Sequence, residues 1–282
     1  MSDTDSKLRL ITYMSPGIPV DVFECILSYL EQVTGKNGYL IYESRWTGPP
    51  SDRVDPFTAN EADIGFMESS DYLRLSSRKD NQVELCEAGP VHTHQKNTGR
   101  AVYYSDIIIN TRNKSKYKDL IDLRGHTFGF SSGKSLSASH VVLAHLKKLG
   151  FDASFFGSTY ESGSHLASID AVLDSRVDVA AVNSNVLSGF LRTRPQLKDD
   201  LCILTSLGPL PTYPIVLNTR LPESVRSTIT QSLLDMSKDR QWCQKLQSYG
   251  ITEFVPIDSS LYDMEKDIKA SIGNLTMAST YY

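Results

Sequence analysis

The sequence has few cysteines, no long hydrophobic run and no dominant sign of charge. Its four cysteines, Cys25, Cys86, Cys202 and Cys243, lie far apart and form no C-x-x-C pair. We therefore expect reduced thiols rather than disulfides or a metal site. No stretch approaches the ~20 apolar residues of a membrane span. The net charge of −4, from 29 basic and 33 acidic residues, creates no global field that would favour nucleic acid.

The amino-terminal segment M-S-D-T-D-S-K-L-R-L is polar and acidic, without the apolar core of a signal peptide. As written, the sequence predicts a cytoplasmic protein, and a periplasmic or extracellular location would require that a leader had been removed. A chain of 282 residues with 40% hydrophobic content can form one large α/β domain or two lobes of ordinary size.

Strand and helix patterns alternate along the chain. Short apolar segments at 8–13, 39–43 and 62–67 predict strands, and the segments between them include amphipathic helices. This order is typical of a parallel sheet with crossover helices. The alternation starts again in the second third of the chain, which predicts two α/β units joined by crossing segments near 101–110 and 209–217.

The crossing segments define the expected domain boundaries. Residues 1–105 and 212–282 should form a discontinuous first lobe, and residues 106–211 should form the second. In open α/β sheets ligands bind at the carboxyl ends of the strands. We therefore expect the ligand between the two lobes, where loops at the carboxyl ends of strands from each lobe meet.

The stretch from Thr127 to Gly150 is the most informative part of the sequence. An apolar strand breaks at a serine-glycine loop, and an amphipathic helix follows, with Ser135 and Ser137 near its N-cap position. A strand that leads through such a loop into a helix N-terminus forms a natural anion-binding site, because backbone N–H groups and the helix dipole converge there. The alternative is that these serines only cap the helix.

His92 and His94 form an H-x-H motif, which could place two imidazoles on one side of an extended segment and bind a metal. No carboxylate or cysteine stands at ligand spacing nearby, so a solvated loop is the favoured interpretation. We expect neither a metal nor a cofactor.

Four sequence motifs follow one another in the order typical of one family. They are D-L-R-G-H-T-F-G-F, then Ser135-Leu136-Ser137, then S-H-L-A-S-I-D-A-V-L-D-S-R-V-D-V-A-A-V-N, and finally L-P-T-Y-P-I-V-L-N-T-R-L-P. Together they resemble the type 2 periplasmic, or solute, binding proteins of the phosphate, phosphite and phosphonate (PhnD-like) branch. The resemblance implies an α/β, two-lobe periplasmic-binding-protein-like type II fold. In that fold each lobe is a mainly parallel sheet flanked by helices, and two crossing strands join the lobes.

The resemblance also implies a set of ligand-binding residues. Serine hydroxyls and the amides of 136–138 would face the ligand's oxygens, His165 would donate to the same anion, and Tyr103 would supply an aromatic ring. Asp178 would accept from a protonated end of the ligand or orient a neighbour, although it could instead pair with Arg176 or an amide. The full set is Ser135, Leu136, Ser137, Ala138, His165, Asp178, Tyr103, Trp46, Thr47, Met67 and Glu68.

Three positions depart from the family pattern. Leu136 replaces a threonine and removes one hydroxyl donor, while its backbone N–H remains. Leu166 replaces the glutamate that would receive an amine substituent. Glu68 stands where the family has small residues, and an ionised carboxylate there would repel a dianion unless it were paired.

These features predict a non-catalytic protein that closes by hinge motion on a phosphonate- or phosphate-like oxyanion, in a solute-binding or sensing role. Its partners would be the small ligand and a transporter or signalling protein, with no nucleic acid. The alternative is an enzyme of pyrimidine-type metabolism on the same scaffold. Such an enzyme needs a nucleophile beside a base, and Cys86 and Cys202 lack an obvious histidine partner in the sequence. A module that acts through protein partners is a third possibility.

Overall fold

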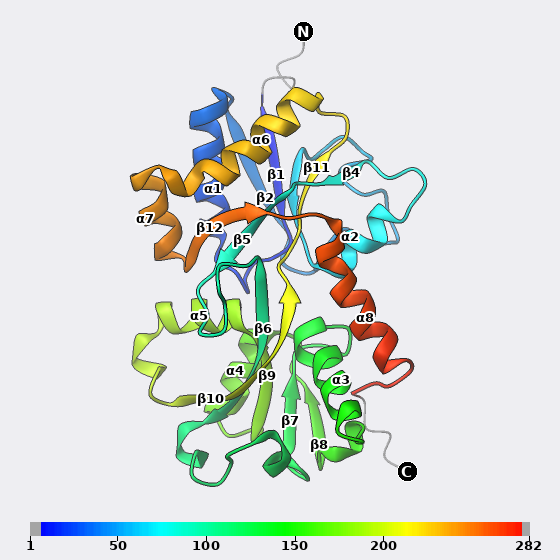
Figure 1. The fold of residues 1–282 in the computed structure, drawn as a ribbon, viewed down its shortest axis with the longest axis vertical. Helices are drawn as coiled ribbons and strands as arrows, with labels where there is room; N and C mark the ends of the chain where they lie inside the picture. The colour runs from blue at the N-terminus through cyan, green and yellow to red at the C-terminus, as the bar shows by residue number, and fades with distance from the viewer. Residues whose placement is uncertain (1–6, 278–282) are drawn as a thin grey trace. The chain divides into compact units, whose positions relative to one another are not determined.

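The computed structural model describes residues 7–277, and the chain divides into two compact α/β units (Figure 1). The first unit consists of Met1–Val102 and Pro211–Tyr262, and the second of Tyr103–Leu210 and Asp263–Tyr282. The expected α/β class is confirmed, and each unit has its own sheet and its own hydrophobic core.

The first unit is built on a five-stranded sheet of order β2-β1-β3-β11-β4. In this sheet β1 runs parallel to β2 and β3, whereas β11 runs antiparallel to β3 and β4. A separate antiparallel pair is formed by β5 and β12. The strands are β1 (Leu8–Thr12), β2 (Gly38–Tyr42), β3 (Ile64–Phe66), β4 (Val83–Leu85), β5 (Ala88–His92), β11 (Ile215–Asn218) and β12 (Ile251–Pro256).

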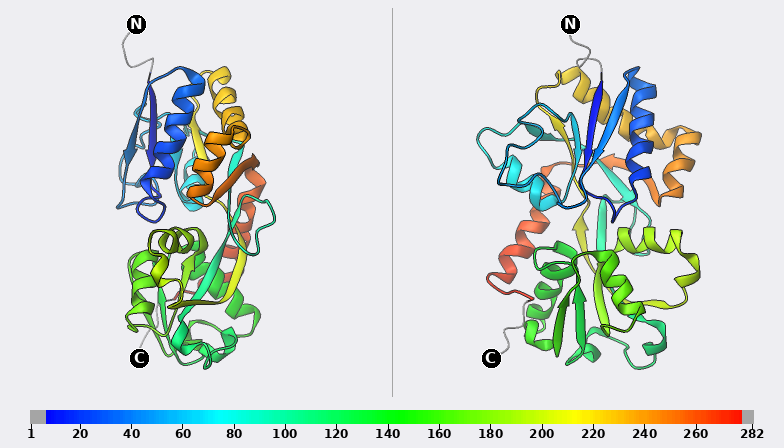
Figure 2. Two further views of the ribbon diagram at one scale, coloured as in Figure 1. Left: turned by 90° about the vertical axis from the view of Figure 1, so that its left-hand side faces the viewer. Right: turned by 180° about the vertical axis from the view of Figure 1, so that it is seen from behind.

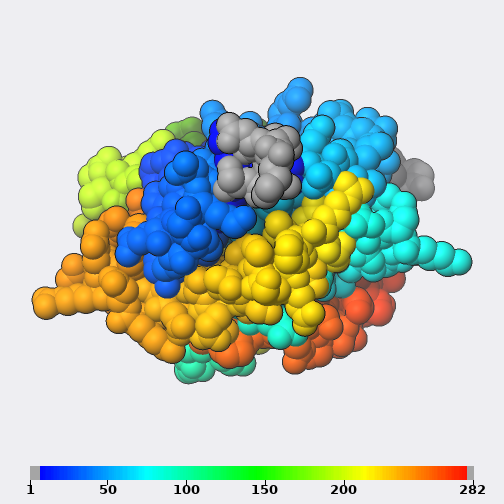
Figure 3. Space-filling model, turned by 90° about the horizontal axis from the view of Figure 1, so that it is seen from above, coloured from blue at the N-terminus to red at the C-terminus, as the bar shows by residue number. Residues whose placement is uncertain are grey.

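Apolar residues at helical spacing attach α1 to this sheet. Val22, Ile26 and Leu30 lie one turn apart and are buried against the strands, and Gly35 ends the helix with a φ of 68°. Figure 2 shows α6 on the same face of the sheet, and Figure 3 shows the side chains of α1 beside those of α6 and α7. The helices of this unit are α1 (Val20–Thr34), α2 (Ser69–Ser76), α6 (Glu223–Asp235) and α7 (Arg240–Ser248).

The second unit has a five-stranded sheet of order β10-β6-β9-β7-β8, in which β7 is parallel to β8 and β9, and β6 is antiparallel to β9. Its strands are β6 (Val102–Asn110), β7 (Thr127–Phe130), β8 (Ser158–Glu161), β9 (Val179–Asn183) and β10 (Leu201–Pro211). Its helices are the π-helical turn Leu136–His140, α3 (Val141–Lys148), α4 (His165–Leu173), α5 (Ser184–Thr193) and α8 (Asp263–Ile272).

Strand β6 separates two layers of this unit by simple alternation of its side chains. Ile107 and Ile109 pack with Ala138 of the π-helical turn, whereas Ile108 packs with Ile169 of α4 on the other face. Both main sheets are mixed, because β6 and β11 run opposite to the parallel strands beside them. The sequence had predicted mainly parallel sheets and did not indicate these antiparallel neighbours.

Helix α8 belongs to the second unit, which corrects the expectation that residues 212–282 are part of the first. It lies beside α3 (Figure 1). Ile272 and Met277 join the core of the second unit, and Lys147 Nζ donates to Ser271 O over 2.7 Å. An amphipathic pattern shows that a helix buries one face, but it does not show which sheet receives that face. Within residues 7–277, no helix combines the length and the apolar character that a bilayer crossing requires.

Replacing Ile272 by Ala tests where α8 packs. The side chain is 5% exposed within the second unit's core, so we expect a loss of about 2–5 kcal/mol in the free energy of unfolding, measured by urea denaturation. Lys266→Ala on the exposed face of the same helix is the matched control and should change stability by less than ~0.5 kcal/mol. Equal effects of the two substitutions would contradict the packing of α8.

Candidate functional site

Three parallel strands of the second unit, β7, β8 and β9, end at the same edge of their sheet, which we call the carboxyl edge. Each is followed by the N-terminus of a helical element: the π-helical turn, α4 and α5 respectively. Ser135, Ser164 and Asn183 cap these three N-termini through their side-chain oxygens. First-turn N–H groups lack partners within a helix, and the helix dipole is positive there, so the carboxyl edge presents the kind of donors that suit an anion.

The π-helical turn shapes the first of these N-termini. The Ser135 carbonyl oxygen accepts from the N–H groups of both Ser139 and His140, each over 3.1 Å, and Ser135 Oγ accepts from Ala138 N over 3.2 Å. The amide of Ala138 is therefore occupied by the cap, while Ser137 Oγ lies 3.5 Å from His165 Nε2. Single π-helical turns are frequent at functional sites.

His165 is held in one tautomer by the backbone. The N–H of Asn183 donates to His165 Nδ1 over 3.3 Å, so Nδ1 is the unprotonated nitrogen and the neutral ring carries its proton on Nε2. Burial lowers the pKa of His165 to about 4. At neutral pH the ring is therefore an uncharged donor whose N–H lies on the Ser137 side.

The structure brings most of the predicted residues of the second unit together. Ser135, Leu136, Ser137 and Ala138 form the cap and the π-helical turn, and His165 begins α4 beside them. Tyr103 is buried in the same cluster as Leu136 and Ala138. Sequence order alone had placed these residues on three separate segments.

Asp178 lies at the opposite edge of the sheet, away from these residues. Its Oδ2 accepts from Thr127 N over 3.0 Å and lies 3.5 Å from His126 Nδ1. Thr127 begins β7 and Asp178 directly precedes β9, so both lie at the amino ends of the parallel strands. Asp178 therefore pairs with a backbone amide, that of Thr127, which was the alternative to its expected role in ligand binding.

The predicted residues of the first unit lie after β2 and β3. Thr47 Oγ1 donates to Asp71 Oδ2 over 2.8 Å, and Glu68 N donates to Thr47 O over 2.8 Å, which attaches the loop to the start of α2. Trp46 is 42% exposed beside this junction. The side chain of Met67 is fully buried in the core of this unit, and its role as a ligand contact stays a prediction.

Sequence reasoning missed Tyr13 and Asp71 in the first unit. Tyr13 directly follows β1, and burial, followed by the nearby Glu43, Asp55 and Asp71, raises the pKa of its hydroxyl well above the ordinary value. Asp71 binds both Thr47 and Arg74. Tyr13 directly follows a strand end, and Asp71 lies in the first turn of the helix that follows β3, and these positions were the signal that could have identified them.

Two residues of the second unit were also missed. Asn183 orients His165 through its backbone, which no residue type in the sequence could reveal. Glu161, the last residue of β8, accepts from Gly133 N over 3.1 Å and supports the loop that precedes the π-helical turn.

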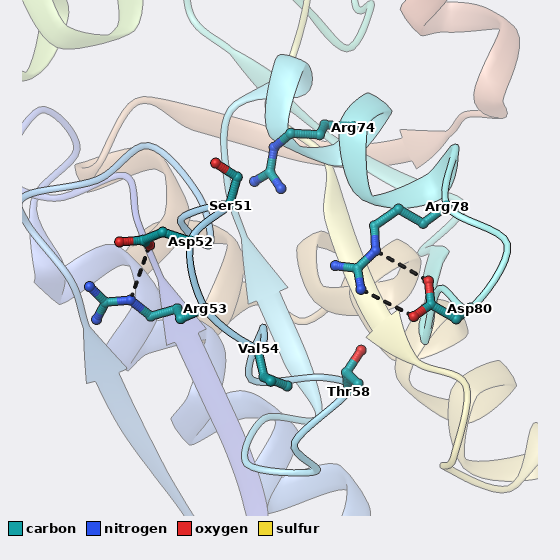
Figure 4. Close-up of a pocket in the computed structure, with 8 residues that line it drawn as sticks. All are labelled: Ser51, Asp52, Arg53, Val54, Thr58, Arg74, Arg78 and Asp80. Atoms are coloured by element: carbon teal, nitrogen blue, oxygen red, sulfur yellow. Dashed lines mark hydrogen bonds and ion pairs between the residues drawn. The ribbon is translucent and has the colours of Figure 1, made fainter.

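An open cavity of about 640 Å³ lies on the first unit (Figure 4). Its three guanidinium groups each have a carboxylate partner: Arg53 with Asp52, Arg74 with Asp71, and Arg78 with Asp80. The pairing leaves no surplus positive charge for an anion. The lining residues are Ser51, Asp52, Arg53, Val54, Thr58, Arg74, Arg78 and Asp80.

The structure gives His92 of the H-x-H motif and the thiol of Cys86 packing roles in the first unit. His92 ends β5, paired with Ile251, and its ring packs edge-on against Tyr213, so it is not part of the solvated loop expected there. The described residues 7–277 contain no group of three or more His, Cys, Asp or Glu that could hold a metal ion. Burial raises the pKa of Cys86 to about 11, which keeps it a thiol rather than a reactive thiolate at neutral pH.

Residues 11–262 match the model of the family described as ABC transporter, phosphonate, periplasmic substrate-binding protein. The chain belongs to this family. Its membership confirms the resemblance seen in the four motifs and places the chain among ligand-binding proteins. No curated protein matches the sequence.

Solved structures show the same fold. PhnD1 from Prochlorococcus marinus, in complex with methylphosphonate, has 17% identity and a TM-score of 0.72 over 96% of this chain and 99% of its own. A binding protein of a phosphonate ABC transporter from Pseudomonas aeruginosa has 19% identity and a TM-score of 0.72 over 95% and 90%. The aliphatic sulphonate-binding protein SsuA from Escherichia coli has 13% identity and a TM-score of 0.59 over 94% and 86%. The type II periplasmic-binding-protein fold is thereby confirmed.

Substituting His165 by Gln tests the neutral state of the ring. With a folded-state pKa of about 4 and an ordinary value of 6.5, the unfolded chain takes up the proton first on acidification. The wild type should therefore lose stability as the pH falls from 6.5 towards 4, by at most ~3 kcal/mol and by less where solvent reaches the ring. His165→Gln cannot titrate and should show a flatter profile in urea unfolding at pH 7, 5.5 and 4.5. Parallel profiles for the two proteins would contradict the assignment.

Proposed function

We propose that this protein binds a phosphonate- or phosphate-like oxyanion without catalysis, and that the anion lies at the carboxyl edge of the second unit. The observation that carries the proposal is the approach of Ser137 Oγ to His165 Nε2 at an edge where three helix N-termini converge. Hydroxyl, imidazole and amide donors arranged around one point suit a tetrahedral anion.

The proposed binding uses neutral donors. The amides of Leu136 and Ser137, the hydroxyls of Ser135 and Ser137, and Nε2–H of His165 supply the hydrogens. A hydrogen bond to a charged group contributes ~1.5–3 kcal/mol, so a few such bonds suffice for specific binding. Leu136 offers only its backbone N–H, which leaves one hydroxyl donor fewer than the family pattern.

In the first unit, Trp46, Thr47 and Glu68 remain proposed ligand contacts. Thr47 and Glu68 are already joined by a backbone hydrogen bond, so the loop and the start of α2 can act together. A carboxylate at Glu68 disfavours a second negative charge nearby.

The family context supports methylphosphonate as the first ligand to test, because PhnD1 from Prochlorococcus marinus is known in complex with it. Transfer of the ligand to an ABC transporter, and a periplasmic location, are part of the same proposal. The alternative of an enzyme with a cysteine nucleophile is disfavoured at Cys86 by its raised pKa.

Ser137→Ala should weaken binding of methylphosphonate by ~10- to 100-fold, because it removes one charge-assisted hydrogen bond. Isothermal titration with methylphosphonate, phosphite and phosphate measures the effect. Ser158→Ala is the matched control, since Ser158 Oγ donates to Thr127 Oγ1 at the opposite edge of the same sheet. Absence of binding of all three anions by the wild type would remove the oxyanion assignment.

Closure by hinge motion is a separate prediction. The chain passes between the units three times: through β6, through β10, and from Tyr262 to Asp263 at the start of α8. A ligand shifts the equilibrium between an open and a closed state only by its differential affinity for the two. Saturating methylphosphonate should lower the radius of gyration in small-angle X-ray scattering, and Ser137→Ala should need more ligand for the same change. An unchanged radius at saturation would argue against closure.

A further inference from the structure

Ser105, in the first half of β6, has a buried hydroxyl that lacks a hydrogen-bond partner within residues 7–277. Its side chain is fully buried, and Oγ contacts no donor or acceptor at hydrogen-bonding distance there. An unsatisfied buried polar group is destabilising, and native proteins keep few of them. Thr212, Tyr213 and Trp242 carry such atoms in the first unit as well. Ser105 differs from these three in its place beside the candidate site, which gives its buried hydroxyl a functional explanation.

The position of Ser105 in the sheet links it to His165. In the antiparallel pairing of β6 with β9, Ser105 lies directly opposite Asn183. Asn183 is the residue whose N–H holds His165 Nδ1 over 3.3 Å. Register partners of antiparallel strands have Cα atoms about 4.5–5.5 Å apart, so Ser105 lies at the carboxyl edge, one strand away from the histidine's anchor.

Its side chain points to the face that carries the anion-binding turn. Alternation along β6 places Ser105 on the same face as Tyr103 and Ile107. Both of these residues pack in the cluster that contains Leu136 and Ala138 of the π-helical turn. The hydroxyl therefore lies in the layer between the sheet and that turn.

The next residue of the same strand shows the contrast. Asp106 points to the opposite face, and its Oδ1 accepts from Ser206 Oγ over 2.6 Å. Asp106 thus has a side-chain partner on one face of β6, whereas the Ser105 hydroxyl on the other face has none within residues 7–277.

We infer that Ser105 is a further ligand-binding residue, whose hydroxyl donates to an oxygen of the oxyanion beside Ser137 and His165. The inference rests on the proposed function, because it requires an anion at the carboxyl edge. Oxyanion oxygens accept several hydrogen bonds each, so an additional buried donor increases affinity without adding charge. Ligand binding would also satisfy the hydroxyl that is otherwise unpaired.

Ser105→Ala separates binding from folding. Removing an unpaired hydroxyl leaves the folded state unchanged or more stable, so the Tm of the free protein should not fall. The affinity for methylphosphonate, measured by isothermal titration, should fall by ~5- to 30-fold. Ser206→Ala is the control, since it breaks a partly buried charge-assisted hydrogen bond on the other face. It should lower Tm and leave the affinity unchanged.

The outcomes distinguish this inference from the proposed function. Wild-type affinity in Ser105→Ala, alongside normal binding by the wild type, would overturn the role of Ser105 while leaving the oxyanion site intact. Weaker binding with a fall in Tm as large as that of Ser206→Ala would show a structural role and would also overturn it. Failure of the wild type to bind methylphosphonate, phosphite and phosphate would remove the proposed function and this inference together.

Discussion

The hydrogen bond from the Asn183 amide to His165 Nδ1 determines what the candidate site can do. It joins the end of β9 to the first residue of α4 and leaves the imidazole proton on Nε2, the nitrogen 3.5 Å from Ser137 Oγ. Because the anchor is a backbone group, the tautomer depends on the geometry of the sheet rather than on a particular neighbouring side chain. A donor held in this way loses little entropy when it meets a ligand.

Neutral donors have a consequence for how the site attracts its ligand. Neither a lysine nor an arginine is among the proposed donors, and burial keeps His165 uncharged at neutral pH. Attraction then depends on helix N-termini and short-range hydrogen bonds, which ionic strength screens less than it screens charges at the surface. Positive charge is present on the first unit, around its open cavity, but each arginine there is paired with an aspartate. Figure 4 shows the pairs of Arg53 with Asp52 and of Arg78 with Asp80.

The two units also differ in how they organise polar groups at strand ends. In the first unit, Thr47, Glu68 and Asp71 form a connected set that ties a loop to a helix. In the second, Ser135 Oγ caps the amide of Ala138, and the Ser105 hydroxyl lacks a hydrogen-bond partner within residues 7–277. Buried polar atoms without such a partner also occur in the first unit, at Thr212, Tyr213 and Trp242. The feature that favours the second unit as the proposed anion site is therefore the set of three helix N-termini at its carboxyl edge.

Local patterns in the sequence were sufficient for much of the architecture. The alternation of apolar segments predicted α/β architecture, and the pattern around Ser135 predicted a strand, a loop and a serine-capped helical turn. Both follow because capping and periodicity depend on neighbours within a few residues. Other features depend on which distant segments pair, and no local pattern contains that information. They are the mixed direction of the sheets, the packing of α8 on the second unit and the sheet edge on which Asp178 lies.

The placement of His165 and Ser105 also depends on distant segments. The sequence by itself determined that a histidine begins a helix and that a serine lies in a strand. Only the tertiary structure decided that the backbone amide of Asn183 in β9 orients His165, and that Asn183 lies opposite Ser105 of β6. Strand register is a property of the assembled sheet, so no local pattern contains it.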